Sequence, residues 1–152
     1  MFWSLAICAF AQNSPTSQEA NLGGYFLKKV VSNSTIPTGV GFTYTIFYTV
    51  PAGSPATTIT DVVPSPLVVD NVIATAVCGT PSVSQTTVVG GTQVSYQIPA
   101  TTSTCSGSFQ INVKFPAGTT CNGETARNRA CLRTSTGADL CTGYVSTTAQ
   151  AT

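Results

Sequence analysis

Two adjacent lysines, one aspartate and one asparagine are the residues of this 152-residue chain whose types could carry out chemistry together: Lys28, Lys29, Asp61 and Asn128. A lysine amine can attack a side-chain amide and form an intramolecular isopeptide bond when a buried carboxylate assists. The alternation around Asn128 places it on the apolar face of an expected strand. The simpler interpretation, which the sequence alone favours, is a hydrogen-bonded core asparagine with both lysines at the surface. Asp61 then has a structural role before a proline-containing turn.

Other kinds of catalytic or metal chemistry find little support in the sequence. The chain has no histidine, and therefore lacks the usual general base and the commonest metal ligand. No C-x-x-C pair is present, so a zinc site is not expected. A calcium site at Asp61 or Asp70 would lack a carboxylate-dense loop. We therefore expect no enzymatic activity, no metal and no cofactor.

The cysteines indicate disulfide bonds in an exported protein. Those after position 11 are Cys78, Cys105, Cys121, Cys131 and Cys141. A three-residue loop at 135–137, with its glycine in the left-handed conformation, would place Cys131 directly opposite Cys141 and within disulfide reach. A similar register argument around the Gly90–Gly91 turn brings Cys78 near Cys105. Cys121 is then the odd thiol.

Three arginines share the outward face of the same expected strand as Asn128. They are Arg127, Arg129 and Arg133. As a basic patch they could bind an acidic glycan or a protein partner. The ordinary alternative, which the sequence favours, is a solvated outer face.

Period-two alternation of apolar and polar residues identifies the elements that must position these side chains. The clearest example is the stretch 40–50, in which every even position is apolar or aromatic. We expect strands at 25–32, 40–50, 56–63, 67–78, 83–89, 92–98, 108–115, 125–134 and 139–149. About nine short strands with frequent turn signals predict an all-β, immunoglobulin-like antiparallel sandwich of Greek-key type. A closed barrel is the alternative.

Composition and the N-terminal residues bear on where the protein acts. Charged residues make up 7% of the chain against about 25% in typical domains, and the net charge of +1 does not favour nucleic acid. We expect 1–11 to be an N-terminally truncated signal peptide, 12–24 a linker and 25–152 the sandwich module. A buried N-terminal strand or helix is the alternative for the first segment. No later stretch is long enough to span a membrane.

A family resemblance is carried by three segments: KKVVSNSTIPTGVGFTYTIFYTVPAG, TITDVVPSPL and INVKFPAGTTCNGETARNRACL. Together they resemble the conserved repeat domain of bacterial secreted and cell-surface proteins, an immunoglobulin-like domain of unknown function. The matching positions are Lys28 or Lys29, Gly41 with Tyr44 and Ile46, the run 60–64, and Asn128 with Ala130. The resemblance covers roughly 25–132 and implies tandem modules in large secreted or wall-attached proteins, without enzymatic activity. This chain departs from it by its higher cysteine content and its single copy.

These observations predict a non-enzymatic, secreted or cell-surface module that serves as a structural spacer or adhesion unit of a larger bacterial surface protein. Its partners would be neighbouring repeat domains of that protein or an unknown surface ligand. Two alternatives stay open: a carbohydrate- or protein-binding module appended to a secreted enzyme, and a filament subunit that exchanges an edge strand. Exposed aromatics clustered on one face would favour glycan binding, but the alternation places most aromatics inside.

Overall fold

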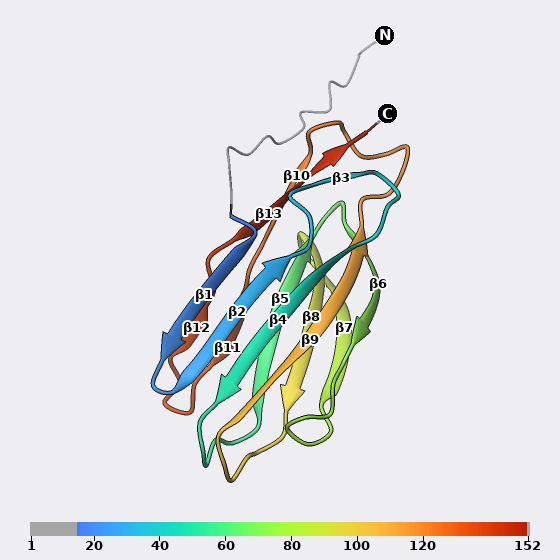
Figure 1. The fold of residues 1–152 in the computed structure, drawn as a ribbon. Helices are drawn as coiled ribbons and strands as arrows, with labels where there is room; N and C mark the ends of the chain where they lie inside the picture. Colours follow the sequence, from blue (N-terminus) through green and yellow to red (C-terminus); the bar gives the residue numbers. More distant parts are fainter. Residues whose placement is uncertain (1–14, 152) are drawn as a thin grey trace.

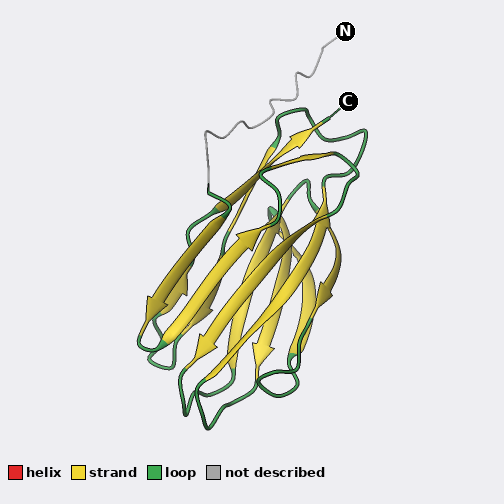
Figure 2. Ribbon diagram, viewed as in Figure 1, coloured by secondary structure: helices red, strands yellow, loops and turns green. Residues whose placement is uncertain are grey.

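The computed structural model describes residues 15–151, and in that range it consists of strands and loops without any helix (Figure 2). The residues assigned to a signal peptide lie outside the described range. The strands are β1 (Ser17–Leu22), β2 (Tyr25–Val31), β3 (Thr35–Pro37), β4 (Phe42–Val50), β5 (Thr57–Pro64), β6 (Val68–Ile73), β7 (Ser82–Val88), β8 (Gly91–Ile98), β9 (Cys105–Lys114), β10 (Thr125–Asn128), β11 (Ala130–Arg133), β12 (Asp139–Cys141) and β13 (Val145–Gln150).

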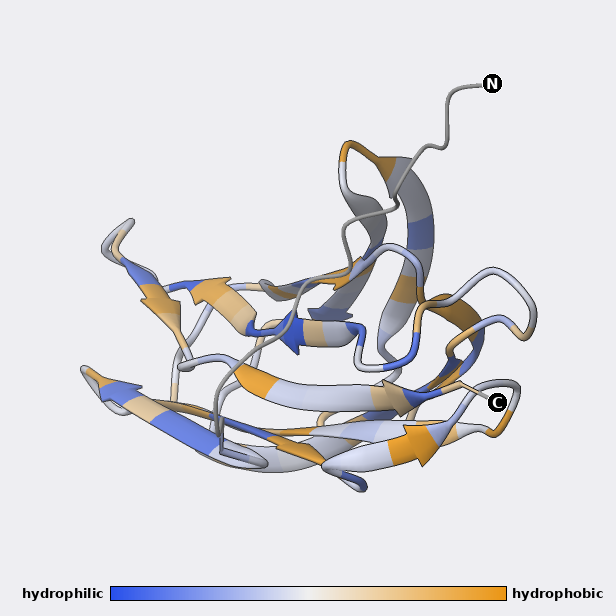
Figure 3. Cartoon of the chain, turned by 90° about the horizontal axis from the view of Figure 1, so that it is seen from above, coloured by the Kyte–Doolittle hydropathy of each residue, from blue (hydrophilic) through white to orange (hydrophobic). Residues whose placement is uncertain are grey.

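Two five-stranded antiparallel sheets form the layers of a sandwich (Figures 1 and 3). One sheet has the order β1-β2-β4-β9-β6 and the other the order β12-β11-β5-β8-β7. A smaller sheet, β10-β13-β3, lies at the end of the sandwich where the described chain begins and ends. The predicted all-β sandwich fold is therefore confirmed.

The core lies between the two layers because each central strand buries alternate side chains. On β4 the buried positions run from Phe42 through Tyr44, Ile46 and Tyr48 to Val50. This is the period-two pattern of a strand with one face against the core.

Aromatic rings from opposite sheets meet in this core. The ring of Tyr96 on β8 stacks on that of Phe109 on β9, with centroids 4.0 Å apart. Tyr48 on β4 lies beside the same tyrosine, at 5.8 Å between centroids. Such pairs contribute about 0.5–1.5 kcal/mol beyond the area that they bury, so the two layers are held by specific packing.

The last two predicted strands are each divided in the structure. The stretch 125–134 forms β10 and β11, with a break at Arg129, and 139–149 forms β12 and β13. β11 stays in the main sheet beside β5, whereas β10 pairs with β13 in the small sheet. Inward alternation continues through the break, since Ala126, Asn128 and Ala130 are all buried.

Two strands appear where the sequence predicted a linker and a turn. Ser17–Leu22, within the expected linker, forms β1 and pairs along its whole length with β2. Thr35–Pro37 forms β3, which runs parallel to β13. Both are polar or very short, which explains why alternation did not reveal them. Within the described part of the chain, no helix has the length and apolar character needed to cross a bilayer.

Candidate functional site

Lys29 occupies a position on β2 that faces the core. Leu27 and Val31, two residues away on either side, are buried on the same face, and Lys29 itself has no exposed surface. Lys28 points the other way and lies 6.0 Å above the ring of Phe47. The expectation that both lysines are at the surface is therefore wrong for Lys29, because the phase of β2 turns one of two adjacent residues inward.

Asp61 meets Lys29 from the opposite sheet. It lies on β5 between the buried Ile59 and Val63 and is 1% exposed. Its Oδ2 accepts a hydrogen bond from the Lys29 Nζ, and the two side chains form a fully buried ion pair. Asp61 is thus a core residue in the middle of a strand, and not the turn-stabilising residue that the nearby proline indicated.

Asn128 and Tyr44 complete this buried cluster. Asn128 is 1% exposed and lies two residues before Ala130, whose register partner across β11 and β5 is Asp61. The ring of Tyr44 has its centroid 4.2 Å from the Lys29 Nζ. Sequence analysis placed Tyr44 in the core by alternation, but had no signal for its contact with a lysine.

Several polar atoms of the cluster make no hydrogen bond of normal geometry. These are both amide atoms of Asn128, the Oδ1 of Asp61 and the hydroxyl of Tyr44. An unsatisfied buried polar group costs about 1–3 kcal/mol. Native cores contain few such groups, and a concentration of them around one amine indicates a site with a purpose beyond packing.

Burial shifts the ionisation of the cluster. It lowers the pKa of the Lys29 amine, and the Asp61 carboxylate opposes this shift only in part. Burial and the charge of Asp61 raise the pKa of Tyr44 well above its ordinary value, while the nearby Asn128 amide opposes the change. Burial therefore makes the Lys29 amine easier to deprotonate than an exposed lysine, and the deprotonated amine is the nucleophilic form.

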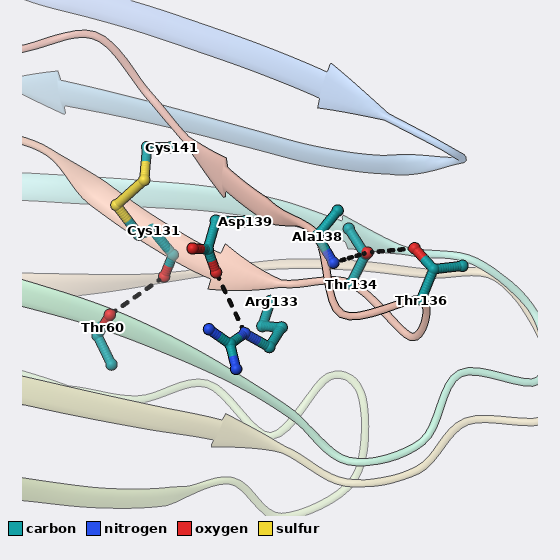
Figure 4. Close-up of polar contacts among 8 residues, drawn as sticks. All are labelled: Thr60, Cys131, Arg133, Thr134, Thr136, Ala138, Asp139 and Cys141. Atoms are coloured by element: carbon teal, nitrogen blue, oxygen red, sulfur yellow. Dashed lines mark hydrogen bonds and ion pairs between the residues drawn. A yellow bond between two sulfur atoms is a disulfide. The ribbon is translucent and has the colours of Figure 1, made fainter.

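The hairpin of β11 and β12 forms one edge of the sheet that contains β5 (Figure 4). Cys131 and Cys141 are register partners on β11 and β12 and are joined by a disulfide, as the loop argument predicts. The loop is closed by a hydrogen bond that the Thr134 N–H donates to the Ala138 carbonyl, and Gly137 has a φ of 87°. This left-handed conformation favours glycine.

The other cysteines of residues 15–151 are also bonded. Cys78 and Cys105 form a disulfide, the pairing expected from the register around the Gly90–Gly91 turn. Cys121 is disulfide-bonded as well, so the expectation of an odd thiol at this position is wrong. The sequence offered no register argument for Cys121, because it lies in a loop between β9 and β10.

The three arginines separate into two groups. Arg133 forms an exposed ion pair with Asp139, at 3.2 Å between Nε and Oδ1. Arg127 and Arg129 both lie over the ring of Tyr144, which sequence analysis did not associate with them. The predicted basic patch is therefore reduced to two arginines and one tyrosine.

A calcium or zinc site has no assembled ligand set in the described residues. Asp61 is buried in the core, whereas Asp70 is exposed and forms an ion pair with Lys114, at 3.3 Å between Oδ1 and Nζ. No group of three or more potential ligands gathers anywhere in residues 15–151.

Comparison with known proteins finds likeness in fold only. No family model matches the sequence, and no curated protein is similar enough to count as a relative. BcpA, the major pilin subunit of Bacillus cereus, aligns with a TM-score of 0.59 and 15% identity over 84% of this chain and 40% of that chain. The major pilin SpaD from Corynebacterium diphtheriae aligns with a TM-score of 0.54 and 17% identity over 88% and 34%. The chain spans less than half the length of these pilins and shares the β-sandwich fold of their domains.

Proposed function

We propose that this chain is a non-enzymatic structural unit of an extracellular surface assembly, locked internally by an isopeptide bond between Lys29 and Asn128. The observation that carries the proposal is the buried cluster in which these side chains gather around Asp61. The likeness in fold to major pilins supports a place in a surface fibre or spacer. Disulfides and a surface poor in charge suit conditions outside the cell.

The proposed reaction needs only groups that the cluster contains. Asp61 accepts a proton from the Lys29 ammonium, which the lowered pKa of that amine favours. The neutral Nζ attacks Cγ of Asn128, so that the Nζ–Cγ bond forms and the Cγ–Nδ2 bond breaks. The departing amide NH2 takes up the proton that Nζ loses in the attack and the proton held by Asp61, and it leaves as ammonium. No oxidant or cofactor is required, and the water-free core favours the uncharged reactants.

A passive mechanical role explains why such a bond would be useful. Lys29 lies on β2 of one five-stranded sheet and Asn128 at the end of β10 in the small sheet, so the bond would join two sheets and two parts of the chain that are far apart in sequence. A covalent bond at this place prevents the strands from separating when the chain is stretched.

Intact mass spectrometry of the reduced, unfolded protein tests the proposal. The wild-type protein should be lighter by one ammonia than its sequence requires. Lys29→Met and Asn128→Ala should each have their full calculated mass, and so should Asp61→Ala, which keeps both reacting side chains. Proteolytic digestion of the wild type should release one branched product that contains both Lys29 and Asn128.

Lys28→Met is the matched control, because Lys28 is adjacent in sequence but faces away from the cluster. It should retain the ammonia loss. A wild-type protein at full mass would contradict the cross-link. A Lys28→Met protein at full mass would show that the bond involves Lys28 and not Lys29.

Glycan binding, the main alternative, has less support. Among the described residues, the aromatic side chains that are clearly exposed are Phe47 and Tyr144, at 40% and 38%. Phe47 lies on the outer face of one sheet and Tyr144 beside the other sheet, so they do not form a common platform.

A further inference from the structure

A hollow of about 360 Å³ opens where strands β5 and β10 diverge. The last register pair between β5 and β11 is Asp61 with Ala130. Beyond it, β5 continues along β8 as far as Pro64, whereas β10 turns to pair with β13. Within residues 15–151, no strand pairs with this side of β5 after Asp61. The hollow is therefore bordered by a short free strand edge.

Two arginines converge at this hollow. The guanidinium carbons of Arg127 and Arg129 lie 4.7 and 5.0 Å from the centroid of the Tyr144 ring. Both arginines are exposed, and all three residues line the hollow. The ring holds the two cations in place through its negative face, and so organises them before any ligand arrives.

Neither arginine has an ion-pair partner among the described residues. The ion pairs in that part of the chain are Lys29 with Asp61, Lys114 with Asp70, and Arg133 with Asp139. Two like charges that lie two residues apart on the outward side of the same segment repel each other. A bound carboxylate would offset this repulsion, since guanidinium groups bind carboxylates through paired hydrogen bonds.

We propose that this hollow binds an extended acidic peptide segment of a partner protein. Arg127 and Arg129 are two positions apart, so their spacing matches that of alternate side chains on an extended peptide. Val62, which is 41% exposed, supplies an apolar contact, and the free edge of β5 lies beside the peptide backbone. An acidic glycan fits less well, because the Tyr144 ring that a sugar would stack on already contacts both guanidinium groups.

A labelled peptide with alternating glutamates provides the test, with fluorescence anisotropy as the readout. The probe is acetyl-Thr-Glu-Val-Glu-Thr-amide carrying a fluorophore, and its partner with both glutamates replaced by glutamine is the control ligand. The acidic peptide should bind to the wild-type protein, and added salt should weaken binding. The Arg127→Gln/Arg129→Gln protein should bind it about tenfold more weakly or worse.

Arg133→Gln is the matched control, since Arg133 is an exposed arginine of the same sheet but already pairs with Asp139. It should bind the peptide as the wild type does. The proposal is overturned if the double variant binds normally, if Arg133→Gln loses as much affinity, or if polygalacturonate binds while the peptide does not. The double variant should keep the ammonia loss of the wild type, so a failure here is distinguishable from a failure of the isopeptide proposal.

Discussion

Burial of the Lys29 amine should make stability depend on pH once the isopeptide bond is prevented. In Asn128→Ala the amine stays free, and its folded-state pKa lies below the 10.5 expected for the unfolded chain. Between these two values the unfolded state binds more protons, so the free energy of unfolding should rise with pH. Above 10.0 the raised pKa of Tyr44 acts in the opposite direction. The rise is therefore expected below pH 10.

Urea unfolding of Asn128→Ala at a series of pH values measures this dependence. Replacing the amine as well, in Lys29→Met/Asn128→Ala, should flatten the curve below pH 10. An unfolding free energy that falls with pH in this window for Asn128→Ala would mean that Lys29 is stabilised as a cation and is not poised as a nucleophile.

The residues of this cluster were only partly predictable from sequence. Two adjacent lysines on a strand must face opposite sides, and the phase set by Leu27 and Val31 identifies Lys29 as the inward one. The burial of Asn128 followed from alternation in the same way. The meeting of Lys29 with Asp61 did not follow, because it depends on how two sheets align and not on any local pattern.

Strand β9 contains a glycine, Gly107, at a position where the Tyr48 side chain of the neighbouring strand β4 leaves no space for a Cβ atom. Gly107 faces Tyr48 across the pair, and a Cβ there would lie 2.5 Å from the Tyr48 hydroxyl oxygen. Because the tyrosine is buried, it cannot move aside freely. Gly107→Ala should therefore lower the free energy of unfolding by about 1–3 kcal/mol, measured by denaturant unfolding.

Gly41→Ala is the matched control for this strand pair. A Cβ at Gly41 would be 3.8 Å from the Val113 carbonyl oxygen, an ordinary contact. Its effect should stay within about 0.5 kcal/mol. Equal effects of the two substitutions would show that strand propensity, and not the contact with Tyr48, decides the cost.

At the level of elements, the sequence predicts strands well where alternation and turn signals agree. The hairpin of β11 and β12 follows from a three-residue loop and its glycine, which fix the register down to Cys131 and Cys141. The division at Arg129 could not be predicted, because inward alternation continues while the partner strand changes from β5 to β13. The local alternation of apolar and polar residues shows which face of a strand is buried. Which strand it pairs with depends on the packing of the whole sandwich.

The whole molecule has both ends of its described chain at one end of the sandwich. The start of β1 and the end of β13 lie at the same end of the sandwich (Figure 1). A force applied through both ends would open the sandwich from there and break hydrogen bonds a few at a time. Hydrogen bonds that break one after another resist only a small force. A covalent bond between β2 and β10 would stop the opening after a short extension.

Single-molecule stretching through both ends of the reduced protein tests the central claim most directly. The proposed bond closes a loop of 99 residue steps between Lys29 and Asn128 that force cannot extend. The wild-type protein should therefore lengthen less than Lys29→Met by roughly 330 Å on complete unfolding, and Lys28→Met should behave as the wild type. Equal extension of the wild type and Lys29→Met would contradict the account, because no covalent bond would then join the two strands.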